Sequence, residues 1–306
     1  MRSRSNGESE MRPEERPKMK FAVSGTGDVY KNVSITCLLD TARRHSVDYI
    51  EVWLPKNFEV EGLEKSIALI RSSGIRVCAL STWTHLFLTE GIEPQQALLI
   101  QAISVAEQIG APLVNTYFGH GKGLDDERAI DIYARNIEPC LKEAAARGIT
   151  ICLENEFDVL GDDPDCSDIT RRPESIRVLM EKVDSPHFRV TFDACNFYFA
   201  GAEPYPYAYE ALKDYIGYVH MKDGTRFRSP IPGRENPLVF TDHSGQYFCV
   251  PVGQGVINHQ CLLSRLKADG YEGFFTVEPH VEQDQLADCH EQSLAYLRRE
   301  LDSKGA

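Results

Sequence analysis

Short apolar runs alternate with longer stretches of helical periodicity along the chain from Lys20 onward. Each run is rich in β-branched and aromatic residues and has the length of a β-strand. Eight runs are predicted strands on this ground: residues 20–25, 48–53, 75–81, 112–118, 149–155, 188–194, 216–221 and 273–279.

Helical patterns fill the segments between these runs. Residues 94–109 have a proline in the first turn, apolar residues three and four apart, and Gly110 as a stop. A second helix is predicted over 126–146, ending before Gly148. Eight strands alternating with helices predict a parallel sheet covered by helices. The regular count favours an α/β fold of the (β/α)₈ TIM-barrel type over an open doubly wound sheet, and no G-x-G-x-x-G follows the first strand.

The domain organisation follows from this pattern. Residues 1–18 are polar and charged, without the apolar stretch of a signal peptide, and are predicted to be a disordered tail. Residues 19–306 are predicted to form a single barrel domain. A long segment after the seventh strand, about residues 224–257, is predicted to be a loop that covers the substrate, because barrels build their sites where strands end.

Composition narrows the functional class. The formal net charge is −13, which argues against a nucleic-acid partner, because phosphate binding draws on clustered Lys and Arg. The apolar runs are shorter than the roughly 18 residues that suggest a membrane span. Nine scattered cysteines, with Cys78, Cys152 and Cys195 inside strand-like runs, fit reduced, mostly buried thiols in a cytoplasmic protein. The oligomeric state stays open, a homo-oligomer included.

The last four predicted strands each end in a residue that can bind a metal. These residues are Glu154, Asp193, His220 and Glu278. The carboxyl ends of parallel barrel strands converge on one mouth, so three carboxylates and an imidazole would crowd together and need a cation. Mixed oxygen and nitrogen ligands suit one divalent ion: Mn²⁺, Mg²⁺, Co²⁺ or Zn²⁺.

The order Glu, Asp, His, Glu on strands five to eight resembles the xylose-isomerase-like superfamily of sugar isomerases, epimerases and dehydratases. Gly253-Gln-Gly255 before the last helix is similar to its Gly-x-Gly segment. The resemblance implies that the four residues are metal ligands. In the ketose 3-epimerase branch the two glutamates, here Glu154 and Glu278, also exchange protons with the substrate through an enediolate.

The chain also departs from that branch. Arg226 falls where the branch keeps a substrate-binding arginine, but Asn196 stands in place of a histidine and Leu160 in place of a glutamate. His220-Met-Lys222-Asp223 is more similar to the His-x-Lys-Asp segment of inosose dehydratase and related branches. Lys222 is therefore a candidate for binding a substrate oxygen.

Further candidates for substrate contact follow other strands. Trp83 and His85 come after the third strand, His120 after the fourth, and Glu156 lies two residues past a predicted ligand. Together with Asn196, Lys222 and Arg226 they complete the predicted substrate-binding set. Glu51 and Trp53 are expected at the rim, whereas four histidines are expected at the surface: His45, His187, His259 and His290.

These observations predict a metal-dependent sugar isomerase or epimerase acting on a ketose, inosose or related polyol ketone. A dehydratase of the inosose type is the alternative in the same class. An AP endonuclease of the same superfamily is disfavoured, because its metal cluster requires a histidine at the position of Asn196. A non-catalytic barrel that binds sugar or metal is the remaining alternative, and the intact ligand set argues against it.

Overall fold

The computed structural model describes residues 20–26, 33–119, 121–122, 125–157, 166–228, 238–242 and 245–302. The predicted tail at residues 1–18 lies outside this part of the chain, as do His120 and Leu160. No helix among the described residues is both long enough and apolar enough to cross a membrane.

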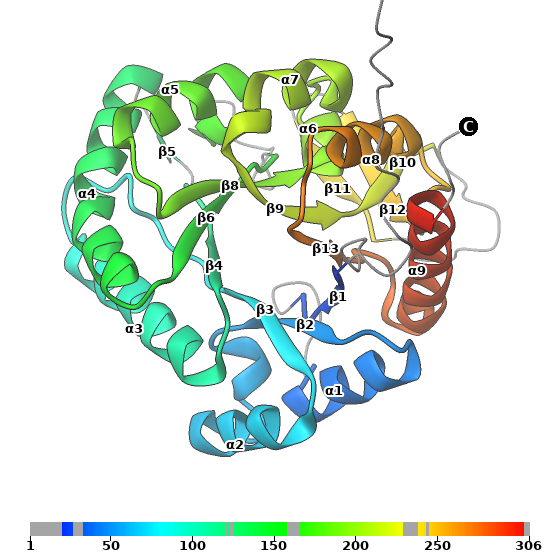
Figure 1. The fold of residues 1–306 in the computed structure, drawn as a ribbon. Coiled ribbons are helices and arrows are strands. Elements are labelled where there is room, and N and C mark those ends of the chain that lie inside the picture. Colours follow the sequence, from blue (N-terminus) through cyan, green and yellow to red (C-terminus); the bar gives the residue numbers. More distant parts are fainter. Residues whose placement is uncertain are drawn as a thin grey trace, which may run out of the picture.

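Eight parallel strands close into a barrel, which confirms the predicted fold class (Figure 1). Their order around the barrel is β1, β13, β9, β8, β6, β4, β3, β2 and back to β1. The strands are β1 (Lys20–Ser24), β2 (Tyr49–Trp53), β3 (Arg76–Ser81), β4 (Leu113–Thr116), β6 (Thr150–Glu154), β8 (Phe188–Asp193), β9 (Ile216–Met221) and β13 (Phe274–Val277). Each lies within a predicted run: β9 matches its run, and the others are one to three residues shorter.

Helices surround the barrel in Figure 1. Two of them test the sequence periodicity directly: α3 spans Glu93–Ile109 and α4 spans Asp126–Ala146, as predicted to within one residue. Asp125 caps α4 by accepting a hydrogen bond from the Arg128 amide. The others are α1 (Ile35–Arg44), α2 (Leu63–Ser73), α5 (Pro173–Val183), α6 (Ala194–Phe199), α7 (Tyr209–Leu212), α8 (His259–Ala268) and α9 (Leu286–Asp302).

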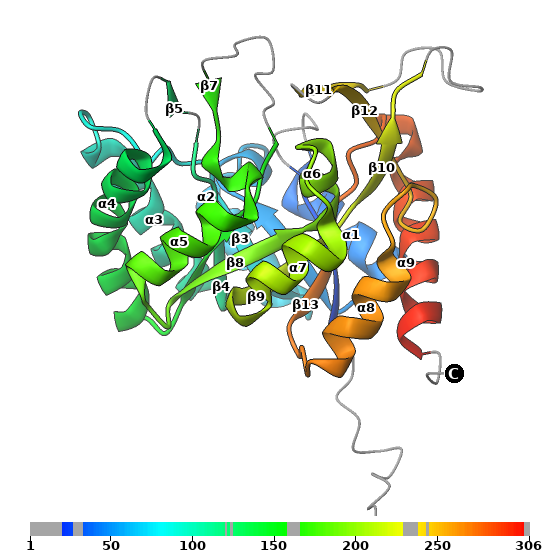
Figure 2. The same ribbon diagram turned by 90° about the horizontal axis from the view of Figure 1, so that it is seen from above.

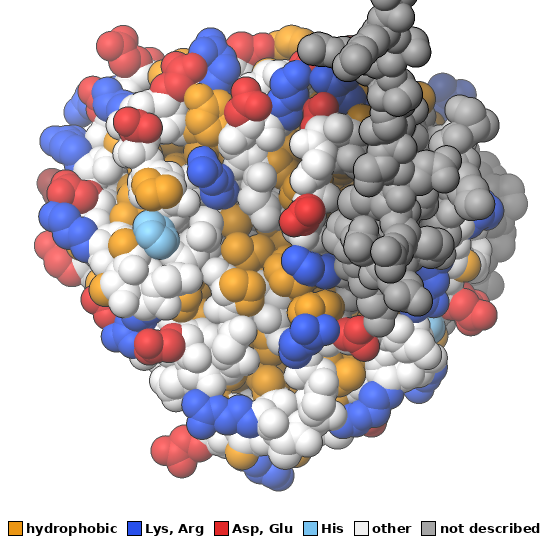
Figure 3. Space-filling view, viewed as in Figure 1, with side chains coloured by type: hydrophobic (Ala, Val, Ile, Leu, Met, Phe, Trp, Pro, Cys, Tyr) orange, Lys and Arg blue, Asp and Glu red, His pale blue; other side chains and the backbone are white. Residues whose placement is uncertain are grey.

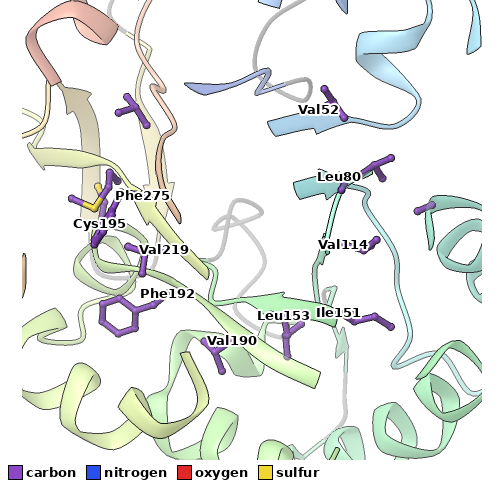
Figure 4. Close-up of a cluster of buried hydrophobic side chains, with 14 of the residues drawn as sticks. Val52, Leu80, Val114, Ile151, Leu153, Val190, Phe192, Cys195, Val219 and Phe275 are labelled. Atoms are coloured by element: carbon purple, nitrogen blue, oxygen red, sulfur yellow. The ribbon is translucent and has the colours of Figure 1, made fainter. Parts of the chain in front are cut away.

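Alternation along the barrel strands separates an apolar outer face from an inner face. The inner face carries a small apolar cluster, with Ala22, Cys78 and Cys152 among its members, and polar residues toward the strand ends. Side chains such as Leu153, Phe192 and Val219 belong to the main hydrophobic cluster between strands and helices (Figure 4). The residues next to them, including Glu154 and His220, point to the barrel interior, because successive side chains of a strand face opposite sides. The barrel interior is therefore polar toward the strand ends, where Glu154 and His220 lie.

Two small antiparallel sheets stand at the end of the barrel where the strands finish (Figure 2). β5 (Gly121–Lys122) pairs with β7 (Cys166–Ser167), while β10 (Asp223–Arg226), β11 (Phe240–Asp242) and β12 (Gly245–Val250) form a three-stranded sheet. The long segment predicted as a loop thus carries a sheet of its own. Its Tyr247 ring stacks on Phe199 of α6, with ring centroids 4.6 Å apart.

The opposite end of the barrel has no such additions among the described residues. In Figure 3, viewed as in Figure 1, hydrophobic side chains lie in the middle of this face with Lys and Arg among them. Tyr49 of β2 packs edge-on against Phe274 of β13 here, and the Arg76 guanidinium lies 4.1 Å from the Tyr49 ring centroid. Aromatic and cation–π contacts therefore close this end, while the polar residues gather at the other.

Three of the sequence expectations need correction. Cys195 lies in α6 rather than in a strand, because β8 ends at Asp193, although its thiol is buried as predicted. His259 and His290 were expected at the surface but are 1% and 2% exposed. Both lie on helices that pack against the barrel, and a single polar residue on an amphipathic helix does not reveal whether its side of the helix is covered.

His290 predicts an acid-sensitive fold. Its ring nitrogens have no hydrogen-bond partner, and burial, with a smaller contribution from His45, lowers its pKa from 6.5 to about 3. Between these two values the unfolded chain binds a proton that the folded chain excludes, so stability falls as pH falls. At about pH 4.5 the loss should be about 3 kcal/mol relative to neutral pH.

Urea unfolding of wild type and His290→Leu across this pH range measures the effect. The variant should lose this part of the pH dependence, whereas His187→Leu, which alters a half-buried ring on a connection, should keep it. If the unfolding free energy of His290→Leu fell with pH as steeply as that of the wild type, His290 would not be the source of the acid sensitivity.

Candidate metal centre at the barrel mouth

Four strand ends bring the predicted ligands to one place. Glu154 ends β6, Asp193 ends β8, His220 lies near the end of β9, and Glu278 follows β13 directly. One ligand atom from each lies within 4.8 Å of those from the other three, and all four side chains are buried. We call these four residues the carboxylate–imidazole cluster. Such a cluster of carboxylate oxygens and an imidazole nitrogen can bind a divalent ion.

The His220 ring lies between carboxylates on both sides. Its Nδ1 is 3.0 Å from Glu154 Oε1 and 3.4 Å from Glu278 Oε2, and its Nε2 is 2.8 Å from Glu51 Oε2. Burial alone lowers the pKa of His220, but Glu154, Glu51 and Glu278 outweigh it and raise the pKa well above its usual value. In this arrangement the ring compensates part of the buried negative charge.

Lys222 supplies the second positive charge. Its Nζ lies 2.9 Å from Glu278 Oε2 and 3.0 Å from Asp193 Oδ2, and the side chain is almost fully buried. Burial lowers the pKa of Lys222, yet the surrounding carboxylates, led by Asp193 and Glu278, raise it well above its usual value. For Glu278, burial raises the pKa, but Lys222 and His220 bring it well below its usual value.

One oxygen of the cluster lacks a hydrogen bond. Asp193 Oδ1 accepts from the Asn196 amide and caps α6, whereas Oδ2 is buried with no hydrogen-bond donor. Lys222 Nζ is close to Oδ2, but the geometry is unsuited to a hydrogen bond, so the contact is electrostatic. A buried carboxylate oxygen without a donor is costly unless a cation meets it. Lys222 meets this need only in part, because its ammonium also pairs with Glu278, and the residues present therefore fit a divalent ion.

Asparagine side chains hold the cluster in place. Asn115 donates from Nδ2 to Glu154 Oε2 at 2.8 Å, and its own Oδ1 accepts from Thr191 at 2.6 Å. Asn155 ties Glu154's strand to β8 by accepting from the Asp193 amide and donating to the Asp193 carbonyl. Sequence reasoning missed both residues, because an asparagine in a strand or just after one is recognised as part of a site only from its partners.

Asn196 turns its amide nitrogen toward the cluster. Nδ2 donates to the Asn155 carbonyl at 2.9 Å and to Glu154 Oε1 at 3.3 Å, while Oδ1 is buried with no partner. Only that oxygen is free for the substrate contact predicted from sequence. The residue thus supports Glu154 at the position where the AP endonuclease cluster requires a histidine.

An aromatic wall lies beside the cluster. Trp83 stacks on Tyr117 with ring centroids 4.3 Å apart, and Trp53 stacks on the same tyrosine at 5.7 Å. Trp83 Nε1 donates to His85 Nε2 at 2.9 Å, so the two predicted residues lie together. Tyr117, which was not singled out in the sequence, joins this wall to the cluster through Asn115, whose Nδ2 lies 3.4 Å from its hydroxyl.

Glu156 and Arg226, the remaining predicted substrate contacts, differ in their exposure to solvent. Glu156 is buried, and burial followed by the nearby Glu154 charge raises its pKa well above the usual value. Arg226 ends β10 with an exposed side chain, and its guanidinium lies 5.6 Å from the Tyr247 ring centroid. His280 packs its ring on Phe240 of β11, and neither of its ring nitrogens has a hydrogen-bond partner.

Contacts with the Asp223 side chain account for the glycines of the Gly253-Gln-Gly255 segment. Its buried carboxylate accepts hydrogen bonds from the backbone amides of Gly224, Gly253, Gly255 and Ile257. A Cβ at Gly255 would lie 2.1 Å from Asp223 Oδ1, so only glycine permits this approach. His259 Nε2 lies 3.1 Å from the Lys222 carbonyl on the same side. The segment thus fixes the backbone from which Lys222 extends.

The sequence matches the family model described as "Xylose isomerase-like TIM barrel" over residues 39–300. No curated protein sequence matches the chain.

Solved structures resemble the chain over nearly its whole length. The probable 3-DHS dehydratase AsbF of Bacillus anthracis is 17% identical, with a TM-score of 0.70, over 91% of this chain and 98% of that one. A D-tagatose 3-epimerase-like protein is 18% identical, with a TM-score of 0.70, over 93% and 97%. The IolI protein, solved with a zinc atom, is 18% identical, with a TM-score of 0.70, over 92% and 98%. At these identities the likeness shows the fold alone.

Gly255→Ala should destabilise the protein by about 2–3 kcal/mol, because its new methyl group meets the Asp223 carboxylate in a packed site. Gly270→Ala is the control, since nothing lies within 4 Å of the added Cβ and only the positive φ of 78° is penalised. That strain should cost about 1 kcal/mol. Urea unfolding compares the two variants, and equal losses would contradict the role given to Asp223.

Proposed function

Since the chain belongs to the xylose isomerase-like TIM-barrel family, we propose that it is a divalent-metal-dependent sugar isomerase or epimerase. Its substrate would be a ketose, inosose or related polyol ketone. The observation that carries the proposal is the carboxylate–imidazole cluster, whose four ligand atoms lie within 4.8 Å of one another in a buried site.

Glu154, Asp193, His220 and Glu278 would hold the ion, which supplies Lewis acidity that acidifies the C–H beside a substrate carbonyl. Two of these residues have a second task in the proposal. Glu154 and Glu278 take and return the substrate proton as general base and acid. Their side chains come from β6 and from the end of β13, which are separated around the barrel by β8 and β9. They therefore approach a bound molecule from different directions.

The neighbouring side chains suit a polyol. Trp83, Tyr117 and Trp53 form an apolar wall against which the C–H face of a sugar can pack. Lys222 and His280 offer hydrogen-bond donors beside Glu278, and the free Asn196 Oδ1 offers an acceptor. A few polar groups at fixed places beside an aromatic surface are the usual means of binding and orienting a small polar ligand.

Loss of a proton-transferring glutamate should stop the reaction. In D₂O, the wild-type protein loaded with Mn²⁺, Mg²⁺, Co²⁺ or Zn²⁺ should exchange a C–H of a ketose or keto-inositol for deuterium, followed by NMR. Glu154→Gln and Glu278→Gln should each slow this exchange by at least about 10²-fold. Glu64→Gln, on the exposed side of α2, is the control and should leave it unchanged. Exchange at the wild-type rate in both site variants would rule out the proposed roles.

Dehydration is the second candidate, and the position of Lys222 favours it. Its ammonium lies 2.9 Å from Glu278 Oε2, inside the cluster rather than in solvent. A cation there can donate a proton to a departing hydroxyl after Glu278 has removed a proton from the adjacent carbon.

Lys222→Met separates the two candidates. If the enzyme is a dehydratase, wild type should lower the substrate mass by one water, and the variant should lose this step by about 10²-fold while retaining C–H exchange in D₂O. Lys222→Arg should not recover the loss, because a guanidinium restores the positive charge but does not give up its proton. Epimerisation leaves the mass unchanged, so mass spectrometry of the wild-type product decides the reaction. An equal loss of exchange and of dehydration in Lys222→Met would remove Lys222 from the leaving-group step.

A further inference from the structure

Glu51 is a buried carboxylate outside the carboxylate–imidazole cluster. It lies in β2 with no exposed surface and has a hydrogen-bond donor at each oxygen. Ser81 Oγ donates to Oε1 at 2.6 Å, and the Tyr218 hydroxyl donates to Oε2 at 2.6 Å. His220 Nε2 lies 2.8 Å from the same Oε2. Three partners around a fully buried carboxylate fix its position closely.

The partners of Glu51 also fix the His220 ring. Tyr218 lies two residues before His220 in β9, so both side chains point into the barrel. Their rings meet edge to face, with centroids 4.9 Å apart and an interplanar angle of 74°. The Tyr218 hydroxyl is held in turn by Thr276, whose Oγ1 is 2.7 Å away. The imidazole is therefore confined by one ring contact and by its bond to Glu51.

The two nitrogens of the ring face different groups. Nε2 faces Glu51, whereas Nδ1 faces the cluster, 3.0 Å from Glu154 Oε1 and 3.4 Å from Glu278 Oε2. A neutral imidazole carries a hydrogen on one nitrogen and can bind a metal only through the other. Whichever group accepts the hydrogen bond therefore selects the nitrogen that is left for the metal.

We propose that Glu51 is a positioning residue that holds the hydrogen of His220 on Nε2, so that Nδ1 is presented to the metal. This inference rests on the metal site of the proposed function, but not on the reaction catalysed there. Partners that orient a metal-binding histidine typically change metal affinity about 10–100-fold when removed. Glu51 is thus expected to contribute to metal binding without contacting the ion.

Glu51→Gln and Glu51→Met form a matched pair for the test. Both remove the charge and keep the length of the side chain, but only glutamine keeps an oxygen that can accept from Nε2. Calorimetric titration with Zn²⁺ or Mn²⁺ should show about 10–100-fold weaker binding in Glu51→Met than in Glu51→Gln. Equal affinities in the two variants would overturn the proposal, since they would leave the hydrogen bond without a role. Circular dichroism melting checks that each variant is folded.

A measurement on the unaltered protein keeps the proposal testable if Glu51→Met does not fold. With ¹⁵N-labelled histidine and ¹¹³Cd²⁺, the His220 signal, assigned by its absence in His220→Gln, should show coupling to cadmium at Nδ1 and a retained hydrogen at Nε2. Coupling at Nε2 would overturn the proposal. Failure of the wild type to bind any of these metals would instead overturn the proposed function, so the two failures are distinguishable.

Discussion

Buried negative charge is the constraint on which the mouth of this barrel depends. Glu51, Glu154, Asp193 and Glu278 are each at most 2% exposed and lie near one another in the barrel interior. A buried carboxylate without a nearby positive charge or hydrogen-bond donor strongly destabilises the folded state. Among the described residues, His220 and Lys222 provide the nearby positive charges, and each lies between two or more carboxylates. A divalent ion would complete the compensation of this negative charge. The buried carboxylates that destabilise the fold are therefore also the groups that can bind the ion.

The barrel can hold these buried charges because each strand has one face in the hydrophobic layer under the helices and the other in the barrel interior. In β6 and β8, Leu153 and Phe192 contribute to the hydrophobic layer under the helices, and the next residue in each strand is a member of the cluster. The free energy of burying the outer residues holds the strands in register. The position of each inner carboxylate follows from that register rather than from contacts within the site. Asn115 and Asn196 then position the Glu154 carboxylate oxygens, and Asn155 holds the backbone of Asp193.

Sequence reasoning succeeded where a residue's environment follows from its place in a regular element. The barrel was predictable because each strand is a short apolar run, and the meeting of Glu154, Asp193, His220 and Glu278 follows from the common direction of parallel strands. Glu51 was expected at the rim, although it lies against His220, because its partners come from β3 and β9. The sheet formed by β10, β11 and β12 was likewise missed. Its strands are short and pack through aromatic contacts with α6 that no local periodicity reveals.

The two glutamates of the cluster are not equivalent, although the sequence presents them alike. Glu278 contacts Lys222 and His220, and these cations lower its pKa against the effect of burial. Glu154 accepts from the amides of Asn115 and Asn196, and burial raises its pKa despite the nearby His220. Two carboxyl groups with opposite shifts are suited to opposite tasks in proton transfer, since one gives up its proton more readily than the other. An ion bound between them would lower both pKa values, but the neutral amides and the ammonium remain on their separate sides. The asymmetry is therefore a property of the protein around the site.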